Sequence, residues 1–154
     1  METMEHKQYC TFYVGGLFFG VEVMRVQEII RYQQMTSVPL APPEVGGLIN
    51  LRGQIVTAVR MRNRLGLPER DDGELPMNVV LTSDHGPVSL LVDEIGDVLE
   101  VRSSDFEPPP EPIDDNIRGL ISGIFKLPDS LMLVLDTQSA ISVDCSNEDS
   151  EIAA

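Results

Sequence analysis

Short runs of alternating apolar and polar residues cover most of the chain. In the first run, which starts at residue 9, Cys10, Phe12 and Val14 fall on one face and the residues between them on the other. The pair Gly15-Gly16 predicts a tight turn, and a second alternating run follows from Leu17. A period of two residues is that of a β-strand with one buried face. The first predicted element is therefore an antiparallel hairpin.

The same signals predict further short elements. They indicate hairpins of strands 47–51 with 54–61, strands 78–83 with 88–92, and strands 117–127 with 131–135. The stretch 23–30 fits a helical turn as well as a strand, because its apolar spacing suits both. Helical turns are expected at 63–67 and, after a cap at Asp136 or Thr137, up to residue 143. Many short strands with frequent turns favour small antiparallel barrels.

Part of the first half of the chain recurs 72 positions further along. Val26 recurs as Val98, Glu28 as Glu100, and the tripeptide Gly-Leu-Ile at 47–49 recurs at 119–121. A unit that occurs twice suggests two similar small β subdomains.

A charged connector marks the expected boundary between the subdomains. Residues 69–76 are rich in charged residues, Gly and Pro. We expect one domain over residues 9–143, with a first subdomain at about 17–76 that also takes the N-terminal strand, and a second at about 77–143. The sequence does not determine which further strands pass from one subdomain to the other. Residues 1–8 and 144–154 are expected to be flexible ends.

Charge and composition narrow the choice of partner. The net charge of the 154 residues is −14, which argues against nucleic acid, because phosphates are bound by clustered Lys and Arg. Residues 1–70 hold eight basic and six acidic side chains, whereas residues 71–154 hold three basic and nineteen acidic ones. Two halves with different electrostatic potentials suit a protein that binds two different partners. A need for solubility explains the uneven charge equally well. No apolar run approaches the roughly 20 residues that span a membrane, so we expect a cytoplasmic protein without membrane insertion.

Candidate catalytic chemistry is sparse. The two histidines, His6 and His85, lie in no metal-ligand spacing, and there is no G-x-S-x-G motif or phosphate-binding loop. We therefore expect no enzyme activity, no catalytic residue, no metal and no cofactor. Cys10 and Cys145 are expected to be free thiols rather than a disulfide in a reducing compartment.

Arginines are a stronger signal. Arg52, Arg60, Arg62 and Arg64 lie within thirteen positions, and alternation predicts that Arg60 and Arg62 share one strand face. Arginine is frequent at protein interfaces, since its guanidinium binds carboxylates bidentately. Pairing within the chain, for example of Arg52 with Glu28, is an equally good explanation.

Three segments follow one another in the first half of the chain: V-Q-E-I at 26–29, Pro39, and G-L-I-N-L-R-G-Q-I-V at 47–56. In this order they resemble the CheW family of chemotaxis coupling proteins, which shows V-x-E-I, a Pro-containing loop and G-[VI]-x-N-L-R-G-x-I-[VI]. Later family motifs correspond to 91–98, the Pro-rich stretch 108–112, 117–119 and 133–136. The resemblance covers residues 9–143.

The resemblance implies both a fold and a function. The fold is mainly all-β, with two five-stranded SH3-like β-barrel subdomains packed side by side and short helices. The function is that of a non-enzymatic adaptor, recruited to receptor arrays. It joins the cytoplasmic tip of methyl-accepting chemoreceptors to the regulatory domain of a CheA-type histidine kinase. A groove between the subdomains would take the receptor's helical hairpin, and the barrel ends would meet the kinase. Carried over by motif, the receptor-facing residues are Val26, Glu28, Gly47, Asn50, Arg52 and Ile55.

Two positions depart from the family pattern. Thr57 replaces a usual Pro, and Arg60-Met61-Arg62 replaces D-L-R, so that Arg60 reverses a charge. Arg60 and Arg62 are therefore candidates for an altered interface, with surface drift as the other explanation. One alternative function is a CheW-like scaffold in a pathway that controls pili, biofilm or a second messenger. The other is a small-ligand-binding barrel, which requires a deep polar pocket.

Overall fold

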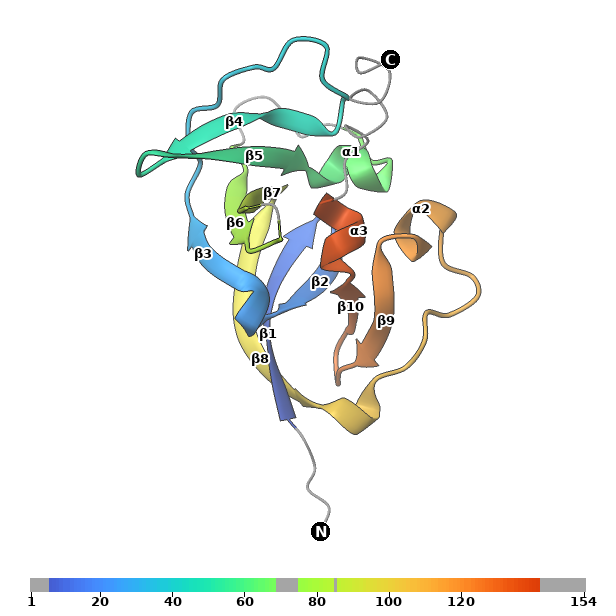
Figure 1. Cartoon of the computed structure of the whole chain (residues 1–154). Helices are drawn as coiled ribbons and strands as arrows, with labels where there is room; N and C mark the ends of the chain where they lie inside the picture. The colour runs from blue at the N-terminus through green and yellow to red at the C-terminus, as the bar shows by residue number, and fades with distance from the viewer. Residues whose placement is uncertain (1–5, 69–74, 85, 142–154) are drawn as a thin grey trace.

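The structure is a computed structural model, and it describes residues 6–68, 75–84 and 86–141. Within these residues the strands form two five-stranded sheets, sheet A in the order β8-β1-β2-β10-β9 and sheet B in the order β3-β6-β7-β5-β4 (Figure 1). The strands are β1 (His6–Val14), β2 (Leu17–Glu22), β3 (Val26–Ile30), β4 (Val45–Leu51), β5 (Gln54–Arg60), β6 (Met77–Leu81), β7 (Val88–Val92), β8 (Glu94–Arg102), β9 (Ile121–Lys126) and β10 (Leu131–Leu135). The helices are η1 (Val23–Arg25), α1 (Met61–Leu65), η2 (Ser103–Asp105), α2 (Asp115–Arg118) and α3 (Thr137–Ile141). The predicted fold class is confirmed.

The two sheets repeat one pattern of strand pairing. In sheet A, β8·β1 and β1·β2 are antiparallel, β2·β10 is parallel and β10·β9 is antiparallel. Sheet B repeats this order of pairings in β3·β6, β6·β7, β7·β5 and β5·β4. Strand β3, which carries Val26, thus corresponds to β8, which carries Val98. The repeat predicted from the sequence is present in the topology.

The division between the sheets differs from the boundary expected near residue 76. Sheet A joins β1 and β2 to the C-terminal strands β8, β9 and β10, whereas β6 and β7 belong to sheet B. Hairpin β1–β2 enters sheet A because β1 pairs with β8, as in Cys10↔Val98, and β2 pairs with β10, as in Gly20↔Val134. The connector 69–74 and the expected flexible ends 1–5 and 142–154 lie outside the described residues.

Three local predictions need correction. The ambiguous stretch 23–30 is divided, with helix η1 followed by strand β3. The strand expected from residue 117 begins only at Ile121, because α2 precedes it and Asp114 caps that helix by accepting a hydrogen bond from Asn116 N (2.8 Å). Strand β5 ends at Arg60 and α1 begins at Met61, so Arg60 and Arg62 do not share a strand face.

One apolar core connects the two sheets. Phe12 and Phe19 of sheet A are fully buried and stack with their ring centroids 5.7 Å apart. They belong to the same cluster as Val59 and Leu90 of sheet B. Burying apolar area stabilises the fold by about 25 cal/mol per Å². Each sheet also has a smaller buried cluster of its own, which includes Ile49 and Val56 in sheet B and Phe125 and Met132 in sheet A.

A polar junction centred on Asp93 joins elements of both sheets. The Asp93 carboxylate accepts hydrogen bonds from Arg62 Nε (3.0 Å) and Nη2 (2.7 Å), and from Gly15 N in the β1–β2 turn (2.7 Å). Arg62 Nη1 also donates to the Pro68 carbonyl (2.8 Å). The Arg62 and Asp93 side chains are each 19% exposed. The guanidinium of Arg62 therefore has internal partners, which explains this arginine without an external interface.

Asp93→Asn is expected to lower the free energy of unfolding by about 2 kcal/mol, since the amide cannot serve as a charged acceptor for Arg62. Urea denaturation measures this change. Glu107→Gln is the matched control, because the Lys126–Glu107 pair is solvent-exposed at 3.5 Å and is expected to contribute less than about 0.5 kcal/mol. Equal stability of Asp93→Asn and wild type would contradict a stabilising role for the junction.

Candidate functional site

The turn between β4 and β5 has a constrained backbone. Arg52 and Gly53 have φ angles of 53° and 86°, the conformation of a two-residue type I′ hairpin turn. Asn50, near the end of β4, stabilises the turn, because its Oδ1 accepts a hydrogen bond from Gly53 N (2.9 Å). A non-glycine residue in the left-handed region costs about 1–2 kcal/mol. Arg52 is therefore held in a strained conformation that aims its side chain in one direction.

Arg52 and Glu28 form a bidentate pair. Arg52 Nη1 lies 2.8 Å from Glu28 Oε2, and Nη2 lies 2.5 Å from Oε1. The Arg52 side chain is 68% exposed and that of Glu28 is 20% exposed. Strands β3 and β4 are the two edges of sheet B, so the pair connects these edges and closes the sheet toward a barrel. The pairing of these residues, considered from the sequence, is confirmed.

The other predicted receptor-facing residues lie at three places in sheet B. Asn50 and Ile55 lie on either side of the turn and are exposed, Ile55 by 59%. Val26, at the start of β3, is half-buried and packs against the main core. Gly47 is buried near the other end of β4, away from the turn. The structure thus joins Glu28 to Arg52 by hydrogen bonds, places Asn50 and Ile55 on either side of the Arg52 turn, and places Gly47 elsewhere.

Gly47 lies where the loop 31–44 packs against β4. Its φ is 148°, and a Cβ atom at this position would lie 2.7 Å from the Thr36 carbonyl oxygen and 3.0 Å from Met35 Cβ. Thr36 and Leu48 exchange two backbone hydrogen bonds, of 2.9 and 2.8 Å, beside this contact. Glycine is therefore needed here for close approach of the loop, and its effect on any partner is indirect.

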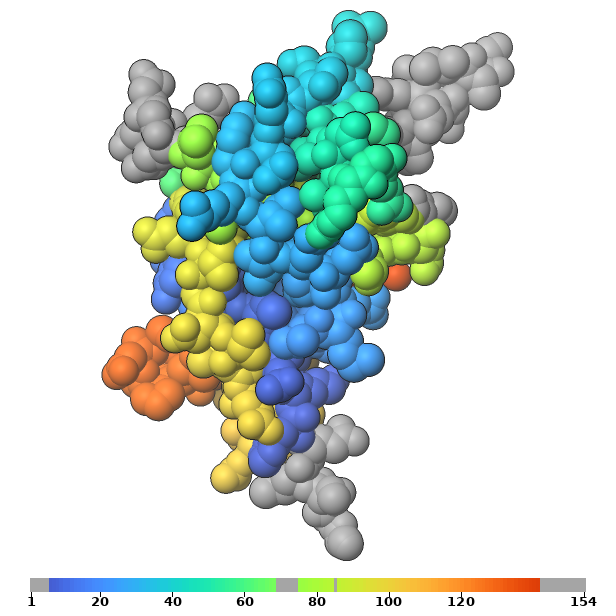
Figure 2. All heavy atoms as spheres, turned by 90° about the vertical axis from the view of Figure 1, so that its left-hand side faces the viewer, coloured from blue at the N-terminus to red at the C-terminus, as the bar shows by residue number. Residues whose placement is uncertain are grey.

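Sequence reasoning did not include Val98 among the candidate site residues, although it is an exposed apolar side chain. Val98, on β8, is 55% exposed and is the repeat counterpart of Val26. Figures 1 and 2 place β3, the β4–β5 turn and β8 on the same side of the molecule. We call this surface, with Val26, Glu28, Arg52, Ile55 and Val98, the edge face. The 72-residue repeat is the signal that could have identified Val98.

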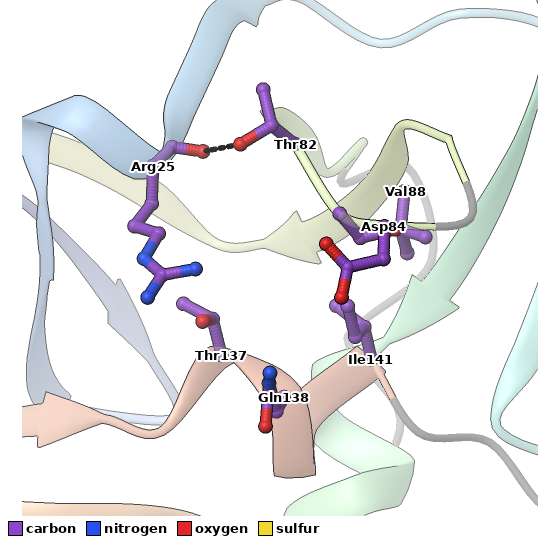
Figure 3. A pocket seen from close by; sticks show the side chains of 8 residues that line it. Arg25, Thr82, Asp84, Val88, Thr137, Gln138 and Ile141 are labelled. Atoms are coloured by element: carbon purple, nitrogen blue, oxygen red, sulfur yellow. Dashed lines mark hydrogen bonds between the residues drawn. The ribbon is translucent and has the colours of Figure 1, made fainter.

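A separate cavity of about 310 Å³ lies between η1, the β6–β7 connection and α3 (Figure 3). Arg25 and Asp84 lie on opposite walls, and Thr137 and Gln138 of α3 contribute a hydroxyl and an amide. In the described part of the chain, no group of three His, Cys, Asp or Glu side chains could hold a metal ion. The lining offers polar binding groups and contains neither His nor Cys among its described residues.

Cys10 is a buried free thiol on β1. Burial raises the pKa of this thiol above its ordinary value, so the thiol stays protonated at neutral pH and is a poor nucleophile. Cys145 lies outside the described residues. None of the described helices is both long enough and apolar enough to span a membrane.

Comparison with known proteins identifies the family. The sequence model of the CheW-like domain matches residues 8–144. The chain belongs to the CheW family. It is 30% identical to the chemotaxis protein CheW of Treponema pallidum, over 90% of this chain and 84% of the relative. It is also 30% identical to that of Bacillus subtilis, over 88% of this chain and 86% of the relative.

The fold of the family is shared as well. The scaffolding protein TtCheW from Thermoanaerobacter tengcongensis superposes with a TM-score of 0.81, at 23% identity, over 91% of this chain and 95% of that protein. CheW family proteins are chemotaxis scaffold adaptors, and this chain has their domain over nearly its whole length.

Gly47→Ala is expected to lower the free energy of unfolding by about 1–3 kcal/mol, because the new Cβ displaces the loop at Thr36. Gly53→Ala is the control, since Gly53 also has a positive φ but has no atom within 4 Å of its Cβ position, so only about 1 kcal/mol of backbone strain is expected. Denaturant unfolding of both variants measures the difference. A cost for Gly47→Ala no greater than that for Gly53→Ala would argue against close packing of the loop.

Proposed function

We propose that this protein is a non-enzymatic adaptor that couples chemoreceptors to a CheA-type histidine kinase. Membership of the CheW family supports the adaptor role. The observation that carries the coupling proposal is the exposed Glu28–Arg52 pair, held on a strained turn beside exposed apolar residues. Strain at a position that makes few core contacts is a reason to infer binding.

The edge face is the proposed binding surface for the cytoplasmic tip of methyl-accepting chemoreceptors. Ile55 and Val98 offer apolar contacts, and the Glu28–Arg52 pair lies in the same surface. An amphipathic helix binds such a surface with its apolar side while polar groups at the margin fix its register. Asn50 stabilises the turn that presents Arg52, and Gly47 acts through the loop 31–44.

The second partner is the regulatory domain of the kinase, bound on a separate surface. Two modest interfaces on one rigid body strengthen each other through effective concentration. The shared core and the Asp93 junction give the two sheets the rigidity that this mechanism needs. In this proposal the protein acts in the cytoplasm at receptor arrays, without cofactor, nucleic acid or membrane insertion.

One observation favours the alternative of a different chemosensory pathway. Arg60 is exposed, and its guanidinium donates only to the Pro43 carbonyl (3.2 Å) among the hydrogen bonds found in the described residues. A positive charge where the family pattern has Asp suits a kinase or receptor with a complementary acidic surface. The pathway could then control pili, biofilm or a second messenger with the same adaptor mechanism.

Arg52→Ala is expected to weaken receptor binding at least about tenfold while the fold remains intact. The exposed ion pair contributes only about 0.2–1 kcal/mol to stability, so its loss is tolerated. Co-sedimentation with receptor-containing membranes measures binding, and thermal unfolding checks the fold. Lys126→Ala is the matched control, because the Lys126 side chain is as exposed as that of Arg52, at 68%, and forms an ion pair on β9, away from the edge face. Wild-type receptor binding by Arg52→Ala would remove the edge face from the proposal.

Isothermal titration of the protein into the regulatory domain of each CheA-type kinase of its own organism is expected to give saturable binding to one of them. That kinase identifies the pathway. No binding to any kinase domain would overturn the coupling function and leave an adaptor for receptors or for other partners.

A further inference from the structure

Strand β8 contains a β-bulge beside Val98, the residue that it contributes to the edge face. Val98 pairs with Cys10 of β1. The next pair toward the start of β8 is Ile95 with Phe12, so β8 uses three residues for a step that takes two on β1. Such an extra residue is a β-bulge, and Thr11 is the residue of β1 that lies opposite it.

The bulge determines the face of the sheet on which Val98 lies. Paired residues have their side chains on the same face, and the faces alternate along a regular strand. Ile95 and Val98 are three residues apart, so in a regular strand they would lie on opposite faces. Because of the bulge, both lie on one face. Val98 therefore reaches the edge face, while Leu99 pairs with Tyr9 on the opposite face and packs against the buried cluster there.

Thr11 stabilises the bulge through its hydroxyl group. Thr11 is 1% exposed, and its Oγ1–H donates to the carbonyl of Asp97, the residue directly before Val98 (2.5 Å). Asp97 pairs with no residue of β1, so the hydroxyl gives its carbonyl a partner where the strand ladder is interrupted. Gly96 leaves room for this contact, because a Cβ atom there would lie 2.5 Å from Thr11 Oγ1. The position of Val98 thus depends on a threonine of the neighbouring strand.

The same hydrogen bond occurs in the other half of the repeat. Arg25 lies 72 positions before Asp97 and directly before Val26, the other valine of the edge face. Thr82 Oγ1 donates to the Arg25 carbonyl (3.4 Å), as Figure 3 shows, and Thr82 N donates to the same oxygen (3.0 Å). Strand β3 also has a bulge there, between Val26 and Glu28. In both halves, the threonine directly follows the residue that pairs with the valine.

We infer that Thr11 is a positioning residue for receptor binding, because its hydroxyl holds the bulge that directs Val98 to the edge face. Thr82 has the same role for Val26, with a longer hydrogen bond. This inference rests on the proposed function, in which the edge face binds the receptor. Thr11 is too deeply buried to contact a receptor and acts through the backbone of β8. A gap of about 0.5–1 Å already removes a quarter to a half of the attraction between two atoms in contact, so a small shift of Val98 weakens binding.

The test is Thr11→Val, which keeps the shape of the side chain and removes its hydroxyl. A methyl group cannot lie as close to the Asp97 carbonyl as the hydroxyl does, so the substitution displaces the bulge. Co-sedimentation with receptor-containing membranes is expected to show a loss of affinity of at least about threefold. Thr11→Ser keeps the hydroxyl and is expected to bind within about twofold of the wild type.

Ser89→Ala is the matched control for lost stability. It removes a hydrogen bond that another fully buried hydroxyl donates, from Ser89 Oγ to Asn78 Oδ1 (2.7 Å), between β7 and β6 of sheet B. Thermal unfolding is expected to show a similar decrease of the midpoint for Ser89→Ala and Thr11→Val, by roughly 2–5 °C. Receptor binding by Ser89→Ala should stay within about twofold of the wild type.

A double variant tests whether Thr11 acts through Val98. Val98→Ala removes the apolar contact and is expected to weaken receptor binding by itself, at least about threefold. If Thr11 only positions Val98, adding Thr11→Val to Val98→Ala lowers the affinity by less than about twofold more, whereas independent effects multiply. Multiplied losses in the double variant would overturn the inference.

The same variants separate this inference from the proposed function. If Arg52→Ala binds the receptor like the wild type, the edge face itself is wrong. If Arg52→Ala binds weakly and either Thr11→Val or Val98→Ala binds like the wild type, only the Thr11 inference is overturned. An equal loss of receptor binding in Ser89→Ala and Thr11→Val would attribute the effect to lower stability and would also overturn it.

Discussion

The passage of the chain from one sheet to the other at Asp93 determines how the two halves lie against each other. Strand β7 of sheet B ends at Val92 and strand β8 of sheet A begins at Glu94, so one residue makes the crossing. The carboxylate of that residue binds Arg62, which follows sheet B, and the turn of the β1–β2 hairpin in sheet A. A partly buried carboxylate is tolerated only when charged and neutral donors replace the lost water. These contacts meet that condition, and the shared apolar core packs beneath the same crossing.

The outer strands of the two sheets are covered in similar ways. Thr36 bridges to Leu48 of β4, and Glu107 bridges to Ile124 of β9, each through a pair of backbone hydrogen bonds. An uncovered strand edge invites pairing with other chains, so such loops protect the fold from aggregation. Both covering segments are followed by prolines, at 39, 42 and 43 in one and at 108 to 110 in the other. The repeated architecture thus extends from the strands to the loops that cover them.

The sequence predicted local structure better than long-range pairing. Hairpins were visible because a two-residue period and turn residues are local signals, as at Gly15-Gly16. The placement of β1 and β2 in sheet A was not visible, because the parallel contact of β2 with β10 joins residues far apart in the chain. Arg62 was assigned to a strand since Met61 carries no signal for a helix start. Its partner Asp93 could not be inferred from spacing.

The candidate site was predicted only in part, because short motifs identify some of its residues and long-range packing brings in the others. The pairing of Glu28 with Arg52 could be considered from the sequence, because an arginine commonly binds a carboxylate bidentately and the family motifs include both residues. Val98 was recognised as a repeat of Val26 but lies outside the motif that gave the site. Binding of a receptor by the edge face stays a prediction.

The order of strands along the chain also sets an order for folding during synthesis. All five strands of sheet B lie within one continuous segment, from Val26 to Val92, so they can pair as soon as that segment has left the ribosome. Sheet A contains the first hairpin made and the last one, and β2 acquires its parallel neighbour only when β10 has been synthesised. Phe12 and Phe19 therefore wait for their final packing while most of the protein is translated. During the time between synthesis of β2 and of β10, the N-terminal hairpin is accessible to chaperones and can associate with other chains. This period ends when β10, the last strand of the domain, has been made.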